Sequence, residues 1–411
     1  MVLKEDIAYA VEEQKLFMLE RNIGVKRSIL NHVQLSSNHI LIITGIRRCG
    51  KSTLMHQLMT KSPEVYSFFN FEDSRVYGFE VADFSKLLES LDKKGNYYFF
   101  DEIQNVKGWE IFIRQLHDRK KTICITGSNA SLLSREMGTK LTGRNIQVEL
   151  FPFSYNEYCL FRKTPVCEKS LLNYLHEGGF PDFLKTKQLE YLQQLFKDIV
   201  YRDIIVRHGI RNDKLFMDIA LFLISNAAKE YSLNGIRNTF KVGSVSSVAD
   251  YVTWLEDAYI LFSVPRFSWS LKSVAVNAKK VYCIDTGFAR ANSLSFSEDK
   301  GRLLENCVFL ELRRNYKEIY YFREKGECDF IVKEGKKIKM VLQVCAEINS
   351  DNLDREVDGL VEALEFFKIK KGTIVTLNQK DTIVRDGKQI ELVPAHLWLK
   401  ALSNDKSKRT E

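Results

Sequence analysis

The chain has 411 residues, of which 45% are hydrophobic and 28% charged, with six prolines and no low-complexity tract. This composition is that of a globular protein and excludes a long disordered linker, and the length predicts two to four domains. The net charge of +8 is compatible with a nucleic-acid partner but too modest to indicate one.

Membrane-spanning and disulfide-stabilised classes are excluded by other features. No apolar run approaches about 18 residues, and the first residues, MVLKEDIAYAVEEQ, lack the pattern of a signal peptide. The eight cysteines form no C-x-x-C pair and the seven histidines show no ligand spacing, so we expect reduced, packed thiols and no zinc site. The sequence therefore predicts a soluble, cytoplasmic protein without a membrane partner.

The segment His39–Met59 carries the most specific pattern in the chain. Residues 1 to about 38 precede it with helical apolar spacing, and we expect them to pack on the edge of the domain that follows. The apolar, mostly β-branched run Ile40–Thr44 predicts a buried strand, and G-x-x-x-x-G-K-S and an apolar helical pattern come after it. Strand, glycine-bounded loop and helix in this order are the context of a P-loop. The residues predicted to hold a nucleotide are Gly45, Ile46, Arg47, Arg48, Cys49, Gly50, Lys51, Ser52 and Thr53.

The residue types of this loop match the chemistry of binding a triphosphate. Gly45 and Gly50 allow backbone dihedrals that a Cβ would forbid, so that successive N–H groups point at phosphate oxygens. The following helix adds its positive N-terminal end. Lys51 would reach the β- and γ-phosphates, and the Ser52 hydroxyl would be a ligand of Mg²⁺. We predict that the chain binds a nucleoside triphosphate together with Mg²⁺.

A Walker B pattern follows the P-loop in the expected order. Tyr97–Phe100 is a short aromatic strand that ends at Asp101 and Glu102, and Asp101 lies 50 residues after Lys51 (101 − 51). In the P-loop scheme Asp101 holds the Mg²⁺, through water or directly. Glu102 would act as the general base that polarises the attacking water.

Two further segments hold candidates for contacts with the γ-phosphate. The apolar strand that begins TICITG runs into Ser128 and Asn129, which could sense that phosphate from the strand end. Arg144 follows soon after, in the motif LTGR. It could be the arginine finger of phosphoryl transfer, in its own subunit or in a neighbour's, or an ordinary loop arginine.

The motifs GIRRCGKST, YYFFDEI, ITGSNASLL, LTGR and LFPFSYNEY, in this order, resemble those of an archaeal and bacterial family of AAA+ ATPases. Two later motifs, EGGFPDFL and YCIDTGFARA, are similar to the same family, so the resemblance covers nearly the whole chain. It implies an AAA+ fold, ATP rather than GTP as the nucleotide, and a C-terminal region with a restriction-endonuclease-like fold.

The middle of the chain has the layout of a winged helix-turn-helix. Three helical patterns and then a β hairpin follow Lys214, and a helix that would enter a major groove begins around Ser246, Ser247 and Asp250. Phosphate contacts are expected from Arg237, Lys241 and Arg266. The alternative is a protein–protein spacer, because residues 205–275 hold eight Lys or Arg against six Asp or Glu and form no basic stripe.

The C-terminal region departs from an active nuclease pattern. In the restriction-endonuclease fold a helix Glu, a strand Asp and a Glu-x-Lys on the next strand converge on Mg²⁺. Glu305 and Asp329 match this pattern, but Gln343 and Cys345 stand where the second carboxylate and the lysine should be. Strand alternation could let Glu347 substitute for the carboxylate, but no residue of this pattern supplies the missing positive charge. We predict a nuclease-like fold without nuclease activity. Its basic residues, which could grip nucleic acid or form a solvated face, are Arg313, Arg314, Lys336, Lys337 and Lys339.

Together these patterns predict an α/β protein. We expect a parallel P-loop sheet of the AAA+ type with helices on both faces over residues 1–160, then a helical connector over 161–205. A winged helix over 206–275 and a smaller restriction-endonuclease-like α/β domain over 276–400 would follow.

The predicted function is ATP binding and hydrolysis by an AAA+ switch or motor that is coupled to double-stranded DNA through its C-terminal half. One alternative is a non-hydrolysing regulatory scaffold that orders its domains around a protein partner. The other is an ATP-dependent nuclease with an altered centre. The sequence leaves the oligomeric state open.

Overall fold

The computed structural model describes residues 1–62, 65–91, 95–128, 143–293 and 299–405. The chain forms two compact units, Met1–Phe151 and Pro152–Glu411, which we call unit 1 and unit 2. The boundaries predicted inside unit 2 stay predictions. Among the described residues, no helix has an apolar stretch long enough to cross a membrane.

Unit 1 is built on a five-stranded sheet in the order β2-β3-β4-β1-β5, and every neighbouring pair of these strands is parallel. The strands are β1 (Ile40–Thr44), β2 (Tyr66–Asn70), β3 (Tyr97–Asp101), β4 (Thr122–Gly127) and β5 (Asn145–Glu149). The described helices are α1 (Lys4–Glu20), α2 (Lys51–Met59), α3 (Phe84–Ser90) and α4 (Trp109–Asp118). Short 3-10 turns lie at Ser28–Asn31, Ser74–Val76, Val81–Asp83 and Ile103–Asn105.

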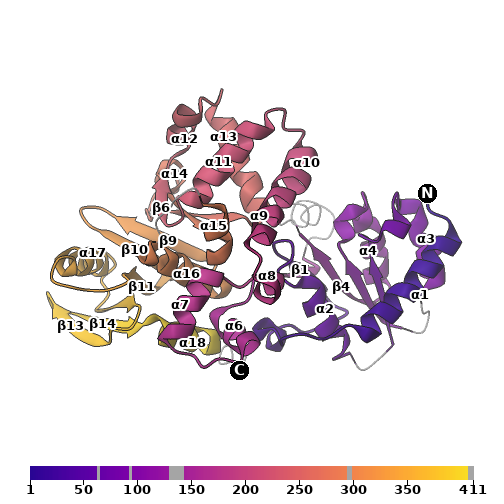
Figure 1. The fold of residues 1–411 in the computed structure, drawn as a ribbon, viewed down its shortest axis with the longest axis horizontal. Coiled ribbons are helices and arrows are strands. Elements are labelled where there is room, and N and C mark those ends of the chain that lie inside the picture. Colours follow the sequence, from indigo (N-terminus) through magenta and orange to yellow (C-terminus); the bar gives the residue numbers. More distant parts are fainter. Residues whose placement is uncertain (63–64, 92–94, 129–142, 294–298, 406–411) are drawn as a thin grey trace. The chain divides into compact units, whose positions relative to one another are not determined.

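Helices of unit 1 cover both faces of its sheet (Figure 1). Helices α1, α3 and α4 share one apolar core with Ile40 and Ile42 of β1. Because strand side chains alternate, the equally buried Leu41 and Ile43 point to the other face, and α2 contacts β3 and β4. The prediction of a parallel P-loop sheet with helices on both faces is therefore confirmed for unit 1.

Unit 2 begins with helices and continues into a small antiparallel sheet. The first helices are α6 (Tyr155–Arg162), α7 (Glu168–Glu177), α8 (Pro181–Thr186), α9 (Leu189–Asp198), a π turn at Ile199–Ile205 and α10 (Val206–His208). Next come α11 (Asp213–Ser225), β6 (Lys229–Tyr231), α12 (Leu233–Phe240), α13 (Val245–Asp257), β7 (Leu261–Pro265), α14 (Leu271–Val276) and β8 (Lys279–Cys283). The three strands pair in the order β6-β8-β7.

The rest of unit 2 is a six-stranded mixed sheet in the order β13-β14-β12-β11-β10-β9, with parallel pairs only at β11–β12 and β12–β14. Its strands are β9 (Glu318–Arg323), β10 (Glu327–Glu334), β11 (Lys337–Val344), β12 (Lys371–Thr376), β13 (Asp381–Arg385) and β14 (Lys388–Pro394). The helices around it are α15 (Thr286–Asn292), α16 (Lys300–Asn315), α17 (Leu353–Phe366) and α18 (Ala395–Asp405).

The two later motifs of the sequence, EGGFPDFL and YCIDTGFARA, meet inside unit 2. The Asp285 carboxylate accepts hydrogen bonds from the N–H of Gly179 at 2.6 Å and, as the N-cap of α15, from the N–H of Phe288 at 2.9 Å. A Cβ on Gly178 would lie 2.0 Å from an Asp285 oxygen, and φ at Gly178 is +73°. Gly178 and Gly179 therefore form a turn that packs directly against the buried Asp285 carboxylate.

Candidate nucleotide-binding site

The loop between β1 and α2 has the backbone that the P-loop pattern predicts. Gly45 has φ +150° and Gly50 has φ +102°, and Gly50 is the N-cap of α2. A Cβ on Gly45 would lie 2.1 Å from the carbonyl oxygen of Leu150, so no larger residue fits there. Arg48 also has a positive φ, +66°. The loop is therefore tightly curled at the carboxyl end of β1.

Lys51 lies over this loop and faces the end of β3. Its Nζ donates to the carbonyl oxygens of Gly45 at 3.2 Å and Ile46 at 3.3 Å, and lies 3.3 Å from Glu102 Oε1. The side chain is only 4% exposed. Burial by itself would lower the pKa of Lys51, but the nearby acidic groups, Glu102 foremost and then Cys49 and Asp101, together outweigh burial and raise that pKa. The ammonium is thus charged and held at the mouth of the loop.

The two predicted Mg²⁺ ligands, Ser52 and Asp101, are near each other, since the Ser52 side chain acts to lower the pKa of the Asp101 carboxyl. Asp101 accepts from the Thr126 hydroxyl, at the end of β4. Burial, and then the charge of Glu102, raise the pKa of Asp101. A hydroxyl and one carboxylate are oxygen donors of the kind that Mg²⁺ takes from proteins, with phosphates and water completing its shell. The residues present therefore fit this cation.

Glu102 is positioned by four neighbours. It has φ +51° and is 8% exposed, its N–H donates to Thr126 Oγ1 at 3.0 Å, and its Oε2 accepts from Gln104 Nε2. Burial would raise its pKa, but Lys51, the Gln104 hydrogen bond and Arg47 together lower it. An ionised, buried carboxylate next to the P-loop is the form that can take a proton from water.

Two of these groups, Thr126 and Gln104, were not singled out from the sequence. Thr126 bridges Asp101 and the Glu102 backbone, and Gln104 lies between Glu102 and Ser128, at 3.5 Å from the Ser128 hydroxyl. The sequence signal for Thr126 was its hydroxyl near the end of β4, directly after the apolar residues Ile123, Cys124 and Ile125.

Arg27 was also missed, because it lies in a segment without a motif. Its guanidinium donates to the carbonyl oxygen of Cys49 at 2.8 Å and to that of Phe151 at 2.7 Å, and the residue is 3% exposed. The Cys49 thiol donates to the Leu150 carbonyl at 3.4 Å, and burial raises its pKa. Arg27 therefore ties the P-loop to the last residues of unit 1.

The remaining predicted site residues of unit 1 are distributed as follows. Arg47 Nη2 lies 2.8 Å from Glu72 Oε1. Asn129 lies outside the described residues. Arg144 pairs with Asp118 at 2.7 Å, on the surface.

Arg144 directly precedes β5, and its role as a finger, in its own subunit or in a neighbour's, stays a prediction. Its carbonyl accepts from the N–H of Ile40, the first residue of β1, whereas the P-loop begins after Thr44, the last residue of β1. Because β1 and β5 are parallel, Arg144 and the P-loop are attached to opposite ends of these strands, which are about 16 Å long at about 3.3 Å per residue.

The predicted centre of unit 2 assembles only in part. Glu305 and Asp329 meet, but the prediction that no residue supplies a positive charge is wrong, because Lys280 Nζ lies within 3.1 Å of both. The proposed substitution by Glu347 is also wrong, since β11 ends at Val344 and Glu347 is exposed beyond it. Cys345 donates to the Glu347 carbonyl at 3.1 Å.

The predicted nucleic-acid contacts differ in exposure. Arg237, Lys241, Ser246 and Asp250 are exposed, as contacts with a duplex require. Ser247 is half-buried, and its N–H donates to the Ser244 hydroxyl at 3.0 Å. Arg266 instead forms an ion pair with Glu324 at 2.9 Å.

The basic residues predicted near the C-terminal centre are also divided. Arg313 and Arg314 are half-buried, and Arg314 donates to the Pro152 carbonyl at 3.0 Å, whereas Lys336 and Lys337 are exposed. Lys339, whose side chain is 45% exposed, lies 3.9 Å from a Glu334 carboxylate oxygen.

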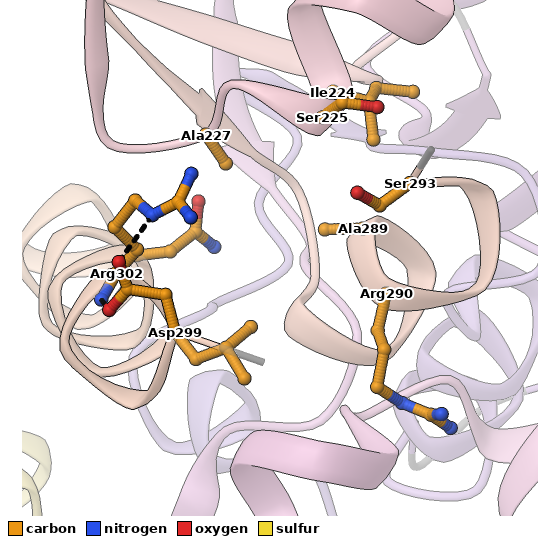
Figure 2. Close-up of a pocket in the computed structure, with 10 residues that line it drawn as sticks. Ile224, Ser225, Ala227, Ala289, Arg290, Ser293, Asp299 and Arg302 are labelled. Carbon is orange, nitrogen blue, oxygen red and sulfur yellow. Dashed lines mark hydrogen bonds and ion pairs between the residues drawn. The ribbon is translucent and has the colours of Figure 1, made fainter. Parts of the chain in front are cut away.

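Unit 2 also has a small pocket between α11, α15 and α16 (Figure 2). Its volume is about 80 Å³, well below the roughly 300 Å³ of small-molecule sites. Its charged groups are engaged within the chain: Arg302 pairs with Asp299 at 2.7 Å, and Arg290 donates to the His176 carbonyl at 3.0 Å. This pocket is therefore not a candidate for the nucleotide site.

Comparison with known proteins supports a candidate nucleotide site in unit 1. Residues 37–159 match the family model described as "AAA domain", and residues 168–299 match a domain of unknown function (DUF8612). The chain is 34% identical over 414 residues to the uncharacterized protein MJ1544 of Methanocaldococcus jannaschii, covering 92% of each chain. An uncharacterized protein of Haemophilus influenzae is 29% identical over 356 residues, covering 81% of this chain and 88% of that one.

Solved structures show weaker similarity. The Thermotoga maritima RuvB Holliday junction branch migration motor is 17% identical, with 64% of this chain and 88% of that chain covered and a TM-score of 0.30. DnaA from Aquifex aeolicus bound to AMPPCP is 12% identical, with 56% and 84% covered and a TM-score of 0.26. The assignment therefore rests on the family model and the archaeal relative: the chain belongs to the family of MJ1544 and carries an AAA domain in its N-terminal part.

Proposed function

We propose that this protein is an ATPase of the AAA+ type that works as a switch or motor. The observation that carries this proposal is the convergence of Lys51, Asp101 and Glu102 at the carboxyl ends of β1 and β3, with Ser52 at the first turn of α2. Ligands of open parallel sheets bind at this edge.

Each residue has a role that follows from its surroundings. The curled P-loop backbone directs N–H groups at the phosphates, and Lys51 neutralises their charge. Ser52 and Asp101 hold Mg²⁺, which supplies Lewis-acid stabilisation of the phosphoryl oxygens when bound. Glu102 accepts a proton from the attacking water, and Gln104 and Thr126 orient it.

The Lys51–Glu102 ion pair links binding to hydrolysis. A triphosphate competes with Glu102 for the Lys51 ammonium, because its oxygens offer more negative charge at the mouth of the loop. When Lys51 turns to the phosphates, the Glu102 carboxylate loses its counter-charge and becomes a stronger base. Substrate binding thus activates the base in this proposal.

Coupling to double-stranded DNA is the second part of the proposal. The order α11-β6-α12-α13-β7-α14-β8, with an antiparallel sheet, supports this proposal, because apart from α14 between the last two strands it follows the order of a winged helix. The exposed residues at the start of α13 and at the end of α12 would meet the duplex. The alternative is a protein partner on the same surface. The observation that supports this alternative is the lack of a basic stripe.

The experiment that tests both parts is phosphate release from ATP by the wild type and Glu102→Gln, with and without double-stranded DNA, at two salt concentrations. Hydrolysis that rises with DNA, and rises less at high salt, supports a DNA-coupled ATPase. Turnover indifferent to DNA indicates a protein partner. ATP binding without turnover in the wild type contradicts the ATPase and favours a regulatory scaffold.

A further inference from the structure

Lys280 of β8 lies at the centre of three carboxylates in unit 2. Its Nζ is 3.1 Å from Glu305 Oε1 on α16, 2.6 Å from Glu327 Oε1 and 2.7 Å from Asp329 Oδ1, both on β10. The lysine side chain is 4% exposed, and those of Glu305 and Asp329 are 11% and 6% exposed. The ammonium donates hydrogen bonds to Glu305 and Asp329 and forms an ion pair with Glu327, whose side chain is 37% exposed.

Other contacts hold the carboxylates in place independently of the lysine. Glu305 Oε1 accepts from the Tyr282 hydroxyl at 2.7 Å. Asp329 Oδ2 accepts from the N–H of Val344 at 2.9 Å, and the Asp329 N–H donates to Gln343 Oε1 at 3.0 Å. The carboxylates therefore come from a helix and a strand that are fixed by their own hydrogen bonds.

Three carboxylates from two elements around one point are a typical arrangement for holding a divalent cation. Buried carboxylates without a counter-charge are strongly unfavourable, so they either take up a proton or pair with a cation. Here the chain supplies a cation, the ammonium of Lys280. The three oxygens lie 2.6 to 3.1 Å from the nitrogen, which are distances of ion pairs, and the oxygens of Glu305 and Asp329 lie beyond the roughly 2.0 to 2.6 Å of Mg²⁺ or Ca²⁺ ligands. In the described part of the chain, no three acidic, His or Cys side chains are arranged to hold a metal.

We propose that the Lys280 ammonium takes the place of a divalent cation in unit 2. The centre is a carboxylate cation site filled by the chain's own lysine, and a divalent cation binds there only when that side chain is removed. Because the Lys280 ammonium is paired with three carboxylates, it is not free to activate water at a phosphodiester. This inference concerns unit 2 and does not depend on ATP hydrolysis in unit 1.

The first test compares the full-length wild type with Lys280→Ala, in the absence of nucleotide, by counting bound Mn²⁺ with electron paramagnetic resonance. Lys280→Ala is expected to bind one Mn²⁺ more than the wild type. The double variant Lys280→Ala/Asp329→Asn is expected to lose that ion. Lys333→Ala, which removes a surface ion pair with Glu318 on the neighbouring strand, is the matched control and should gain none.

Two results would overturn the proposal. One is Mn²⁺ bound by the wild type and lost in Asp329→Asn, since the centre would then take a metal with the lysine present. The other is a Lys280→Ala protein that binds no more Mn²⁺ than the wild type.

Loss of the ammonium leaves three carboxylates facing one another, so Lys280→Ala can fail to fold in metal-free buffer. The same variant is then refolded from urea across a Ca²⁺ titration and followed by circular dichroism. Recovery of the folded signal with Ca²⁺, absent in the double variant, supports the proposal. Failure to recover at any Ca²⁺ concentration overturns it.

Discussion

Lys51 and Glu102 form an ion pair across the mouth of the P-loop, with 3.3 Å between Nζ and Oε1 and both side chains largely buried. The pair joins the group that binds phosphate to the group that accepts the proton. It also explains why the pKa of Glu102 is lowered despite burial. A ligand that moves the Lys51 ammonium away from Glu102 would raise the pKa of Glu102 and make it a stronger base.

Glu102→Gln should abolish turnover while keeping ATP binding. The amide cannot take a proton, and general-base catalysis contributes roughly 10²- to 10⁴-fold, so phosphate release should fall by about that factor. Binding of a fluorescent ATP analogue should remain, because the amide also frees Lys51 for the phosphates. Lys51→Ala is the matched control and should lose binding. Wild-type turnover in Glu102→Gln would show that another group is the base.

Arg144→Ala tests the finger role that remains open. We propose that Arg144 acts in a neighbouring subunit, since the P-loop of its own subunit lies at the opposite end of the parallel strands β1 and β5. The variant should lose hydrolysis, and mixing it with Glu102→Gln should restore part of it, because mixed assemblies combine an intact base with an intact finger. Its stability should change by less than about 1 kcal/mol, as for an exposed ion pair. Full activity of Arg144→Ala alone would make it an ordinary surface arginine.

Arg27→Gln should destabilise unit 1 and weaken nucleotide binding together. The substitution removes charge-assisted hydrogen bonds to the Cys49 and Phe151 carbonyls, each worth about 1.5 to 3 kcal/mol. Urea unfolding monitored in the full chain, with and without ATP, measures both effects. Arg114→Gln, on the exposed side of α4, is the control and should change neither. Stability equal to that of the wild type would contradict a structural role for Arg27.

Asp285 should make stability depend on pH in a defined window. Burial raises its pKa from 3.8 to about 6, although the N–H groups of Gly179 and Phe288 oppose this. Because the folded state keeps the proton that the unfolded chain releases above about pH 4, this contribution is complete below that pH and is lost as pH rises to about 6. The loss is roughly 3 kcal/mol, at about 1.4 kcal/mol per pKa unit.

The measurement for Asp285 is the free energy of unfolding in urea at pH 4, 5, 6 and 7 for the wild type and Asp285→Asn. The stability of the wild type relative to the variant should fall across this range, because only the wild type carries the titrating group. A constant difference would show that Asp285 does not titrate there. Asp182→Asn, on α8 and paired with Lys185 near the surface, serves as the control.

Local sequence patterns were sufficient for the nucleotide-binding half. The strand Ile40–Thr44, the glycines of the P-loop and the Asp101–Glu102 strand end depend on interactions between near neighbours in sequence, so spacing alone predicted them. Because β1 and β3 are parallel, their carboxyl ends share one edge of the sheet, and this brings Lys51 to Glu102. Arg144 precedes its strand β5 rather than following it, so parallel pairing puts it at the opposite end of the strands from the P-loop.

Contacts between residues far apart in sequence were decided only by the tertiary structure. Arg27 reaches Phe151, Gly179 reaches Asp285, and Lys280 reaches Asp329, and none of these residues stands in a motif that names its partner. The positive charge that the C-terminal pattern lacked is supplied by Lys280 on β8, a strand of the small three-stranded sheet. An ion pair requires a short distance between ammonium and carboxylate but no particular spacing of the two residues along the chain, so the sequence could not indicate it. The sequence by itself determined the residue types of the nucleotide site and their order. The pairing of strands and the burial of charges determined which of those residues meet.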